Sequence, residues 1–326
     1  MNIEEITEKT PYRKILGMPQ FAGFEKYLLP LRGIKGMGMR LMKPSSFAMW
    51  DGKLIADGFR FLAAAAEKTK IFFSYYDGPE AKRNPALKEE VLFFLPAGTD
   101  GEKRPCVFVC AGGGYSMACN LIEAFPVAEK IHAHGFHAVV VNYRTGKDAV
   151  CPNPIEDLAK AVNFVFAHAD SLRVLTDRYY VMGFSAAGHL VSNYAVRENG
   201  YGRYGAPKPS GVILSYPVID LGEYSHADTR RQFLGKKYAD DGEVAARYTA
   251  WNHLTATYPP VFVWAFDRDD TVNPVNSQIF AERAEDAGVR CRLELYPGTI
   301  HGASLGTGTT CEGWLDRAFA YLGETI

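Results

Sequence analysis

The sequence predicts an α/β protein with a mostly parallel central sheet and helices on both of its faces. From about residue 70 onward, fully apolar runs alternate with segments of helical periodicity. Fully apolar runs are typical of strands that are buried on both sides, as they are in parallel sheets. With 326 residues, 47% of them hydrophobic and 13% aromatic, the chain is long enough to bury a large core.

The expected strands follow in order along the chain. The first two apolar runs, KIFFSYY and EVLFFLPA, are separated by a polar stretch, which favours an antiparallel start. The later apolar runs are PCVFVC, HAVVVNYR, YYVMGF, GVILSYPV, PVFVWAF and CRLELYP. Apolar residues at helical spacing predict helices at 121–134, 155–169, 186–197 and 274–287.

The strand series defines a main domain at residues 69–326. Residues 1–68 contain no such series, and the segment GFRFLAAAAEKTK is expected to be helical because of its alanine run and closing basic residues. We therefore expect residues 1–68 to form an N-terminal extension packed on the core. Residues 220–256 interrupt the alternation between two strands. Their charges and aromatic side chains suit a helical insertion over the carboxyl edge of the sheet, where such sheets bind ligands.

The composition excludes several classes of protein. The 36 basic and 37 acidic residues nearly cancel, so nothing steers the chain toward nucleic acid or anionic lipid. No run approaches the roughly 18 apolar residues of a spanning helix, and the N-terminus lacks the pattern of a signal peptide. The six cysteines have no metal-ligand spacing and are expected to be buried reduced thiols. We expect a cytoplasmic protein that acts on a small molecule, with no metal and no nucleic-acid or membrane partner; a homo-oligomer is left open.

A candidate nucleophile lies where an apolar strand turns abruptly into a helix. The stretch YYVMGFSAAGHL places Ser185 at this turn, with Gly183 on one side and Ala187 on the other. It resembles the nucleophile elbow, a strained strand-to-helix turn that exposes a serine hydroxyl and needs small residues two positions away on either side. The alternative is a serine that only caps the following helix.

A glycine-rich loop supplies candidate donors for a negatively charged reaction intermediate. The apolar strand VFVC runs into AGGGY, and glycines allow backbone N–H groups to point into a site. We expect the N–H of Gly113 or Gly114, together with that of Ala186, to form an oxyanion hole. A phosphate-binding turn and a plain tight turn are the alternatives, although GGGYSM completes neither the dinucleotide nor the P-loop pattern.

An acid and a base are expected in the loops after the last two strands. His301 follows CRLELYPG and suits general-base catalysis, because histidine titrates near neutrality. Asp269 follows PPVFVWAF and is the preferred partner that would fix the imidazole tautomer, with Asp267 and Asp270 as alternatives. Among the other histidines, we expect His189 to bond locally and name two as candidates to line the pocket, namely His226 and His253.

These segments resemble a known family. GGGYS, DLAKAVNFVFAHA, GFSAAGHL, SYPVID, PPVFVWAF with DDTVNPVNS, and HGASLGTGT are similar to bacterial acetyl-esterase and acetyl-xylan-esterase-like α/β hydrolases, over residues 90–326. The resemblance implies the α/β-hydrolase fold and a catalytic triad of Ser185, Asp269 and His301. Asp269 is selected because it lies three residues before a valine, as in the D-x-x-V pattern of the family. The sequence departs from the family at Ala111 and Ala187, where histidine or proline and glycine are usual.

The resemblance further implies hydrolysis of short acyl esters, often acetyl groups on sugars, without an organic cofactor or metal. The first hypothesis is therefore a serine carboxylic ester hydrolase that works through an acyl-enzyme on a small-molecule ester, with acetylated carbohydrate as a candidate. A serine peptidase or another acyl transferase on the same fold is the alternative, because the same triad serves these reactions. A binding protein without catalytic activity is the third hypothesis.

Overall fold

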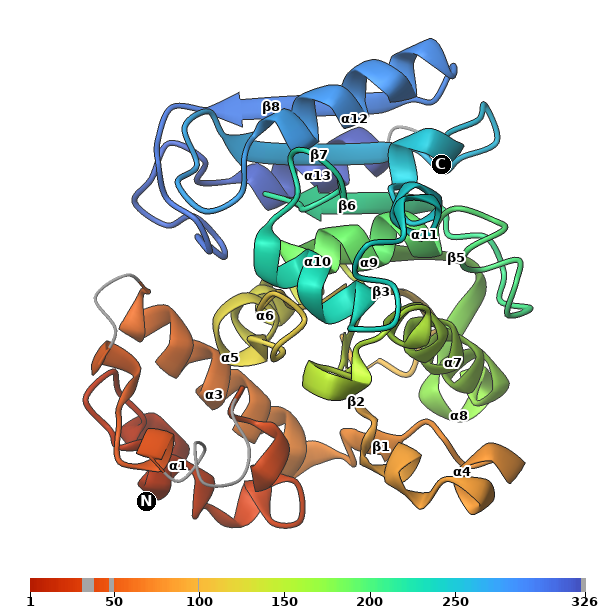
Figure 1. Ribbon diagram of the computed structural model, residues 1–326. Helices are drawn as coiled ribbons and strands as arrows, with labels where there is room; N and C mark the ends of the chain where they lie inside the picture. The colour runs from red at the N-terminus through yellow and green to blue at the C-terminus, as the bar shows by residue number, and fades with distance from the viewer. Residues whose placement is uncertain (31–37, 47–49, 99, 324–326) are drawn as a thin grey trace.

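The computed structural model describes residues 1–30, 38–46, 50–98 and 100–323. Its centre is an eight-stranded sheet with the order β1-β2-β4-β3-β5-β6-β7-β8 (Figure 1). The strands are β1 (Phe72–Ser74), β2 (Val91–Leu95), β3 (Arg104–Cys110), β4 (His137–Val141), β5 (Val174–Phe184), β6 (Gly211–Ser215), β7 (Val261–Phe266) and β8 (Cys291–Tyr296). β2 pairs antiparallel with β1 and β4, and all other pairs of neighbours are parallel. The antiparallel start and the mostly parallel sheet are thus confirmed.

Helices cover both faces of this sheet. The helices of the described residues are α1 (Tyr12–Leu16), α3 (Gly52–Lys68), α4 (Pro79–Arg83), α5 (Asn120–Glu123), α6 (Phe125–Ala133), α7 (Asn153–Ala167), α8 (Ala169–Leu172), α9 (Ala186–Tyr194), α10 (Ala227–Leu234), α11 (Gly242–Arg247), α12 (Val275–Asp286) and α13 (Trp314–Gly323). Short 3-10 helices lie at Ile3–Glu5, Pro19–Phe21, Glu25–Tyr27, Pro44–Ser46, Pro85–Glu89, Gly146–Asp148 and Ala250–His253.

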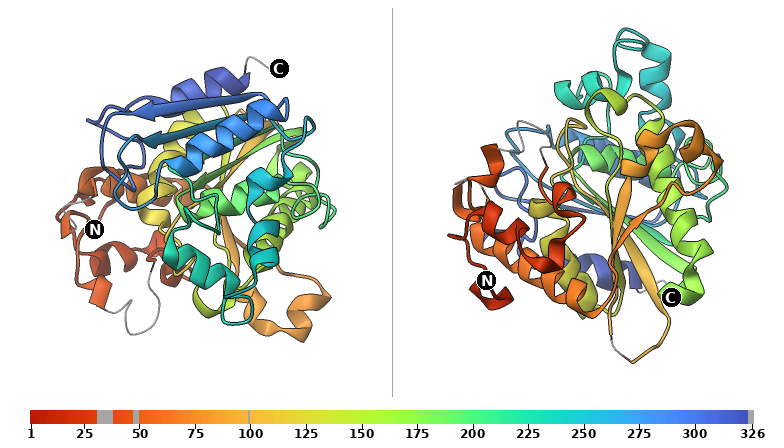
Figure 2. Two further views of the ribbon diagram at one scale, coloured as in Figure 1. Left: turned by 45° about the horizontal axis from the view of Figure 1, so that its top comes forward. Right: turned by 90° about the horizontal axis from the view of Figure 1, so that it is seen from below.

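The two faces carry separate cores because side chains alternate along a strand. In β3, Val107 and Val109 belong to the core that also contains buried residues of α3, α6 and α13. Cys106 and Phe108 point the other way, into the core shared with α7, α9 and α12. Figure 2 shows α3 and α6 on one side of the sheet and α7 on the other.

Several helix bounds differ from those expected. The segment 121–134 forms two helices, α5 and α6, which meet at Ala124; Pro126 lies in the first turn of α6, where its missing N–H costs no helical bond. Helix α3 begins earlier than its alanine run, because Asp51 accepts hydrogen bonds from the N–H groups of Lys53 and Leu54. Helix α13 was not anticipated.

The N-terminal segment shares the core of the α3–α6 face. Phe24 lies 5.8 Å from Phe93 of β2, and Phe93 lies 5.2 Å from Phe125 of α6, measured between ring centroids. Phe21 and Phe59 are buried in the same cluster. The domain boundary at 68/69 stays a prediction, and residues 31–37 and 47–49 of the expected extension lie outside the described residues.

The expected insertion, between β6 and β7, contains the helices α10 and α11 and the 3-10 helix at Ala250–His253. It reaches the glycine loop after β3, since a Cβ atom built on Gly114 would lie 3.5 Å from Cβ of Asp228 and 3.8 Å from Cε1 of His226. In the part of the chain that the structure describes, no helix combines the length and hydropathy needed to cross a bilayer. The cytoplasmic location expected from the sequence stays a prediction.

A buried ion pair ties α7 to the end of β4 and gives a prediction about stability. Asp157 has a fully buried side chain and accepts hydrogen bonds from Arg144 Nε at 2.8 Å and from the Tyr76 hydroxyl at 2.6 Å. Asp157→Asn should lower the free energy of unfolding by about 3 kcal/mol, because it leaves a buried guanidinium without its main partner. Urea unfolding measures this loss. Glu156→Gln is the control, since Glu156 binds the same arginine but its side chain is 35% exposed, and it should cost less than about 1 kcal/mol.

Candidate active site

The turn between β5 and α9 holds Ser185 in a strained conformation. Its φ is 51° and its ψ is −122°, a region that non-glycine residues rarely occupy. The turn needs small neighbours: a Cβ atom on Gly183 would overlap the carbonyl of Ala187, and one on Gly188 would overlap Pro217. The Ser185 side chain makes no capping hydrogen bond to α9. The capping alternative is therefore wrong, and the hydroxyl points elsewhere.

Ser185, His301 and Asp269 form one hydrogen-bonded line at the carboxyl ends of β5, β8 and β7. The Ser185 hydroxyl lies 2.8 Å from His301 Nε2, and His301 Nδ1 lies 2.7 Å from Asp269 Oδ2. The other carboxylate oxygen of Asp269 accepts the N–H groups of Thr271 and Val272, both at 2.9 Å. These bonds fix the carboxylate against the imidazole, which then carries its proton on Nδ1 and presents a lone pair to the serine.

The other two aspartates of this loop face away from the imidazole. Asp267 accepts the N–H of Gly298 at 2.9 Å, and its side chain is 44% exposed. Asp270 accepts the hydroxyl of Thr271 at 2.9 Å and is exposed. Asp269, with a side chain only 1% exposed, is thus the aspartate that the structure brings to His301.

The glycine loop after β3 passes directly over the nucleophile. A Cβ atom on Gly112 would lie 2.7 Å from Cβ of Ser185 and 2.8 Å from the carbonyl oxygen of Phe184, so only glycine fits there. Gly113 and Gly114 adopt positive φ values of 125° and 61°. Among the described residues, no acceptor pairs with the N–H groups of Gly113, Gly114 or Ala186, which leaves these expected oxyanion donors available.

Two histidines of the earlier expectations occupy different surroundings. His226 lies beside Gly114, where burial lowers its pKa. His189 is fully buried, bonded at 2.9 Å to the Tyr115 hydroxyl and at 2.7 Å to the carbonyl of Tyr248, and burial lowers its pKa to about 3. His189 therefore remains neutral, and its hydrogen bond to Tyr115 connects α9 to the end of the glycine loop.

Two buried residues beside the site were missed by the sequence analysis. The Glu123 carboxyl accepts the N–H of Gly112 at 2.6 Å and the hydroxyl of Tyr216 at 3.0 Å. The Tyr216 ring stands edge-on to the ring of His301, with 4.9 Å between centroids. The available signal was a lone glutamate in the otherwise apolar stretch LIEAFPVA, directly after the glycine loop.

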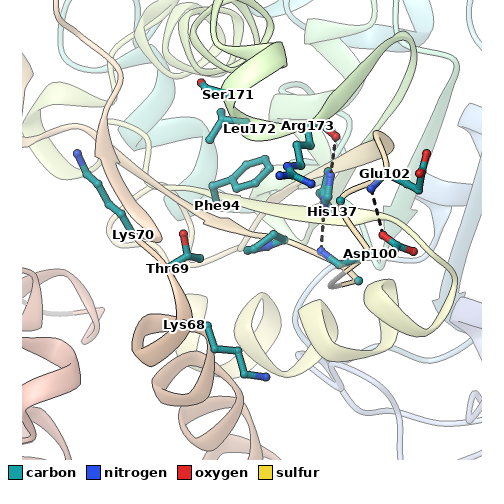
Figure 3. Close-up of a pocket in the computed structure, with 14 residues that line it drawn as sticks. Lys68, Thr69, Lys70, Phe94, Asp100, Glu102, His137, Ser171, Leu172 and Arg173 are labelled. Atoms are coloured by element: carbon teal, nitrogen blue, oxygen red, sulfur yellow. Dashed lines mark hydrogen bonds between the residues drawn. The ribbon is translucent and has the colours of Figure 1, made fainter.

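A separate cavity of 390 Å³ lies at the opposite edge of the sheet, where β3 and β4 begin (Figure 3). His137 lines it, but both of its ring nitrogens are engaged: Nδ1 accepts the N–H of Ala97, and Nε2 donates to the carbonyl of Arg173. No cluster of three metal-ligating side chains occurs in the described part of the chain. All six cysteines are unpaired; four are buried as expected, whereas Cys119 and Cys291 are partly exposed.

Comparison with known proteins decides the family. Residues 93–284, which span β3, the elbow and the aspartate loop, match the BD-FAE family. The chain belongs to the BD-FAE family. Together with the relatives and solved structures described next, this match confirms the fold class and the resemblance to acetyl-xylan-esterase-like α/β hydrolases.

The BD-FAE chain has relatives among larger proteins. It is 31% identical over 224 residues to endo-1,4-beta-xylanase B of Butyrivibrio fibrisolvens, covering 66% of this chain and 35% of the xylanase. It is 31% identical over 234 residues to an acetylxylan esterase of Xylanibacter ruminicola, covering 68% of this chain and 45% of the esterase. The chain thus spans less than half the length of these curated relatives.

Solved structures of similar fold include two hydrolases. One is an acetyl ester-xyloside bifunctional hydrolase from Caldicellulosiruptor lactoaceticus, with a TM-score of 0.66, 25% identity, and coverage of 78% of this chain and 94% of that chain. The other is a carboxylesterase from Lactobacillus plantarum, with a TM-score of 0.61, 25% identity, and coverage of 72% and 92%. Both similarities leave about a quarter of the BD-FAE chain unmatched.

Proposed function

We propose that this BD-FAE chain is a serine carboxylic ester hydrolase that removes short acyl groups through an acyl-enzyme. The observation that carries the proposal is the hydrogen-bonded line from Ser185 through His301 to Asp269, beneath unpaired backbone N–H groups. A serine hydroxyl is a weak nucleophile by itself, and an adjacent base supplies the activation that it needs.

In the first half of the reaction, the Ser185 oxygen attacks the ester carbonyl while His301 Nε2 accepts the serine proton. Negative charge develops on the carbonyl oxygen, where the N–H groups of Gly113, Gly114 and Ala186 stabilise it. The Asp269 carboxylate stabilises the imidazolium that forms. The bond to the alcohol then breaks, and the imidazolium returns the proton to the departing oxygen.

In the second half, water replaces the alcohol. His301 accepts a proton from this water, whose oxygen attacks the acyl carbonyl, and the same N–H groups stabilise the second oxyanion. Collapse of this intermediate breaks the bond to Ser185 Oγ, which regains a proton from the imidazolium. The products are a carboxylic acid and free enzyme, and the balance requires no cofactor.

We propose an acetyl or similarly short acyl group, carried by a small molecule or a sugar. Two relatives are named for xylan or its acetyl esters.

A substrate panel tests the proposal. We expect p-nitrophenyl acetate to give a kcat/KM at least tenfold above that of p-nitrophenyl octanoate, and we expect deacetylation of acetylated xylo-oligosaccharides. A fluorophosphonate probe should label Ser185, as located by peptide mass spectrometry, because the probe mimics the acylation step. A protein that binds an ester ligand but is not labelled by the probe would support the non-catalytic hypothesis. Faster turnover of peptides than of esters would favour the peptidase alternative.

A further inference from the structure

Glu123 is a carboxylic acid buried directly across the glycine loop from the nucleophile. A Cβ atom on Gly112 would lie 2.7 Å from Ser185 Cβ on one side and 3.1 Å from Glu123 Oε2 on the other. Glu123 is 5% exposed and, in the part of the chain that the structure describes, forms no ion pair. Burial raises the pKa of Glu123, and the hydrogen bond from Gly112, the electrostatic interaction with His301 and the hydrogen bond from Tyr216 counteract part of this effect.

Burying a carboxyl group costs free energy, so a residue needed only to fill space would be apolar. The carboxyl instead accepts two hydrogen bonds, which come from two different segments of the chain. Its bond to the N–H of Gly112, at 2.6 Å, fixes the peptide that enters the glycine loop. The orientation of that peptide determines where the following N–H groups of Gly113 and Gly114 point.

The second hydrogen bond leads to the loop that carries the base. The Tyr216 hydroxyl donates to Glu123 Oε1 at 3.0 Å and accepts the N–H of Ser304 at 3.2 Å. Ser304 lies three residues after His301 and has a positive φ of 54°. Tyr216 itself has a φ of 37°, a strained backbone conformation that the surrounding structure must maintain. The Glu123 carboxyl therefore links the glycine loop to the histidine loop, whose relative position matters for catalysis.

We propose that Glu123 is a positioning residue. It fixes the glycine loop, through Gly112, relative to the histidine loop, through Tyr216 and Ser304. This inference rests on the proposed function, because it assigns a role in the same reaction. It predicts that loss of the two acceptors misplaces the oxyanion donors and lowers turnover, while the pocket that binds the substrate stays intact.

A series of side chains with the same length tests the proposal. In Glu123→Met both acceptors are lost, and we expect kcat for p-nitrophenyl acetate to fall about a hundredfold, the scale of a misplaced or lost oxyanion donor. KM should stay within about threefold, because the missing stabilisation acts on the transition state. Glu123→Gln keeps an acceptor for Gly112 and should restore kcat to within about tenfold of wild type. Glu129→Met, an exposed position on α6, is the control and should match wild type.

The outcomes separate clearly. A wild-type kcat in folded Glu123→Met, or a raised KM with unchanged kcat, would overturn the inference. If Glu123→Met does not fold, Tyr216→Phe decides, because it removes the hydroxyl that bonds Glu123 and Ser304: a five- to tenfold loss of kcat supports the inference, and a wild-type kcat overturns it. Failure of the proposed function can be told apart from failure of this inference. If the Ser185→Ala variant were still active, Ser185 would not be the nucleophile, whatever the Glu123 variants show.

Discussion

Replacing Ser185 with alanine is expected to lower kcat for p-nitrophenyl acetate by at least about 10⁴-fold, because removing the nucleophile of a triad leaves only the oxyanion donors and substrate binding. The variant should fold normally. Alanine also lacks a γ oxygen to meet the imidazole, so the 2.8 Å bond to His301 Nε2 is simply lost. Steady-state kinetics and circular dichroism measure the two expectations.

A serine from the same helix provides the control for this substitution. Ser192 of α9 is buried and donates its hydroxyl to the carbonyl of His189 at 3.1 Å, away from the reacting groups. Ser192→Ala should keep kcat within about threefold of wild type while costing about 1 kcal/mol of stability. Ester hydrolysis at wild-type rates by pure Ser185→Ala protein would rule out the serine mechanism proposed here.

Asp269→Asn is expected to lower kcat by about 10⁴-fold with little change in fold, because an amide can donate to His301 Nδ1 and so favour the wrong imidazole tautomer. The carboxylate now accepts from Nδ1 at 2.7 Å and is almost fully buried, so solvent cannot replace it. Kinetics with p-nitrophenyl acetate give the comparison.

The neighbouring aspartates make matched controls, because they carry the same charge on the same loop. Asp267→Asn and Asp270→Asn should each keep kcat within about threefold, since their carboxyl groups bond to Gly298 and Thr271 and not to the imidazole. A loss in either control as large as that in Asp269→Asn would contradict the proposed assignment of the acid.

The sheet and the candidate triad could be predicted because their signals are local. Apolar runs predicted the strands of the parallel sheet, and Ser185, Asp269 and His301 each lie in the turn or loop that follows one of these runs. The sequence favoured Asp269 and kept Asp267 and Asp270 as alternatives, because the geometry depends on the direction in which each side chain leaves the loop.

The support around the site could not be predicted, because it depends on contacts between distant segments. Glu123 and Tyr216 are 93 residues apart, and nothing in either local sequence indicates that they bond. The break between α5 and α6 follows from Pro126, yet the periodicity of apolar residues continued across it. The alanine run predicted only the turns of α3 from Gly58 onward, whereas the helix begins at Gly52, after the capping residue Asp51.

The aromatic cluster that joins Phe24, Phe93 and Phe125 has a practical consequence for protein production. The family match begins at residue 93, inside β2, so a fragment that started there would lose β1 and α3 together. The face of the sheet that α3 shields would then present bare phenylalanine rings and an unpaired strand edge to solvent. Such surfaces promote aggregation, and expression should therefore retain the residues upstream of the match.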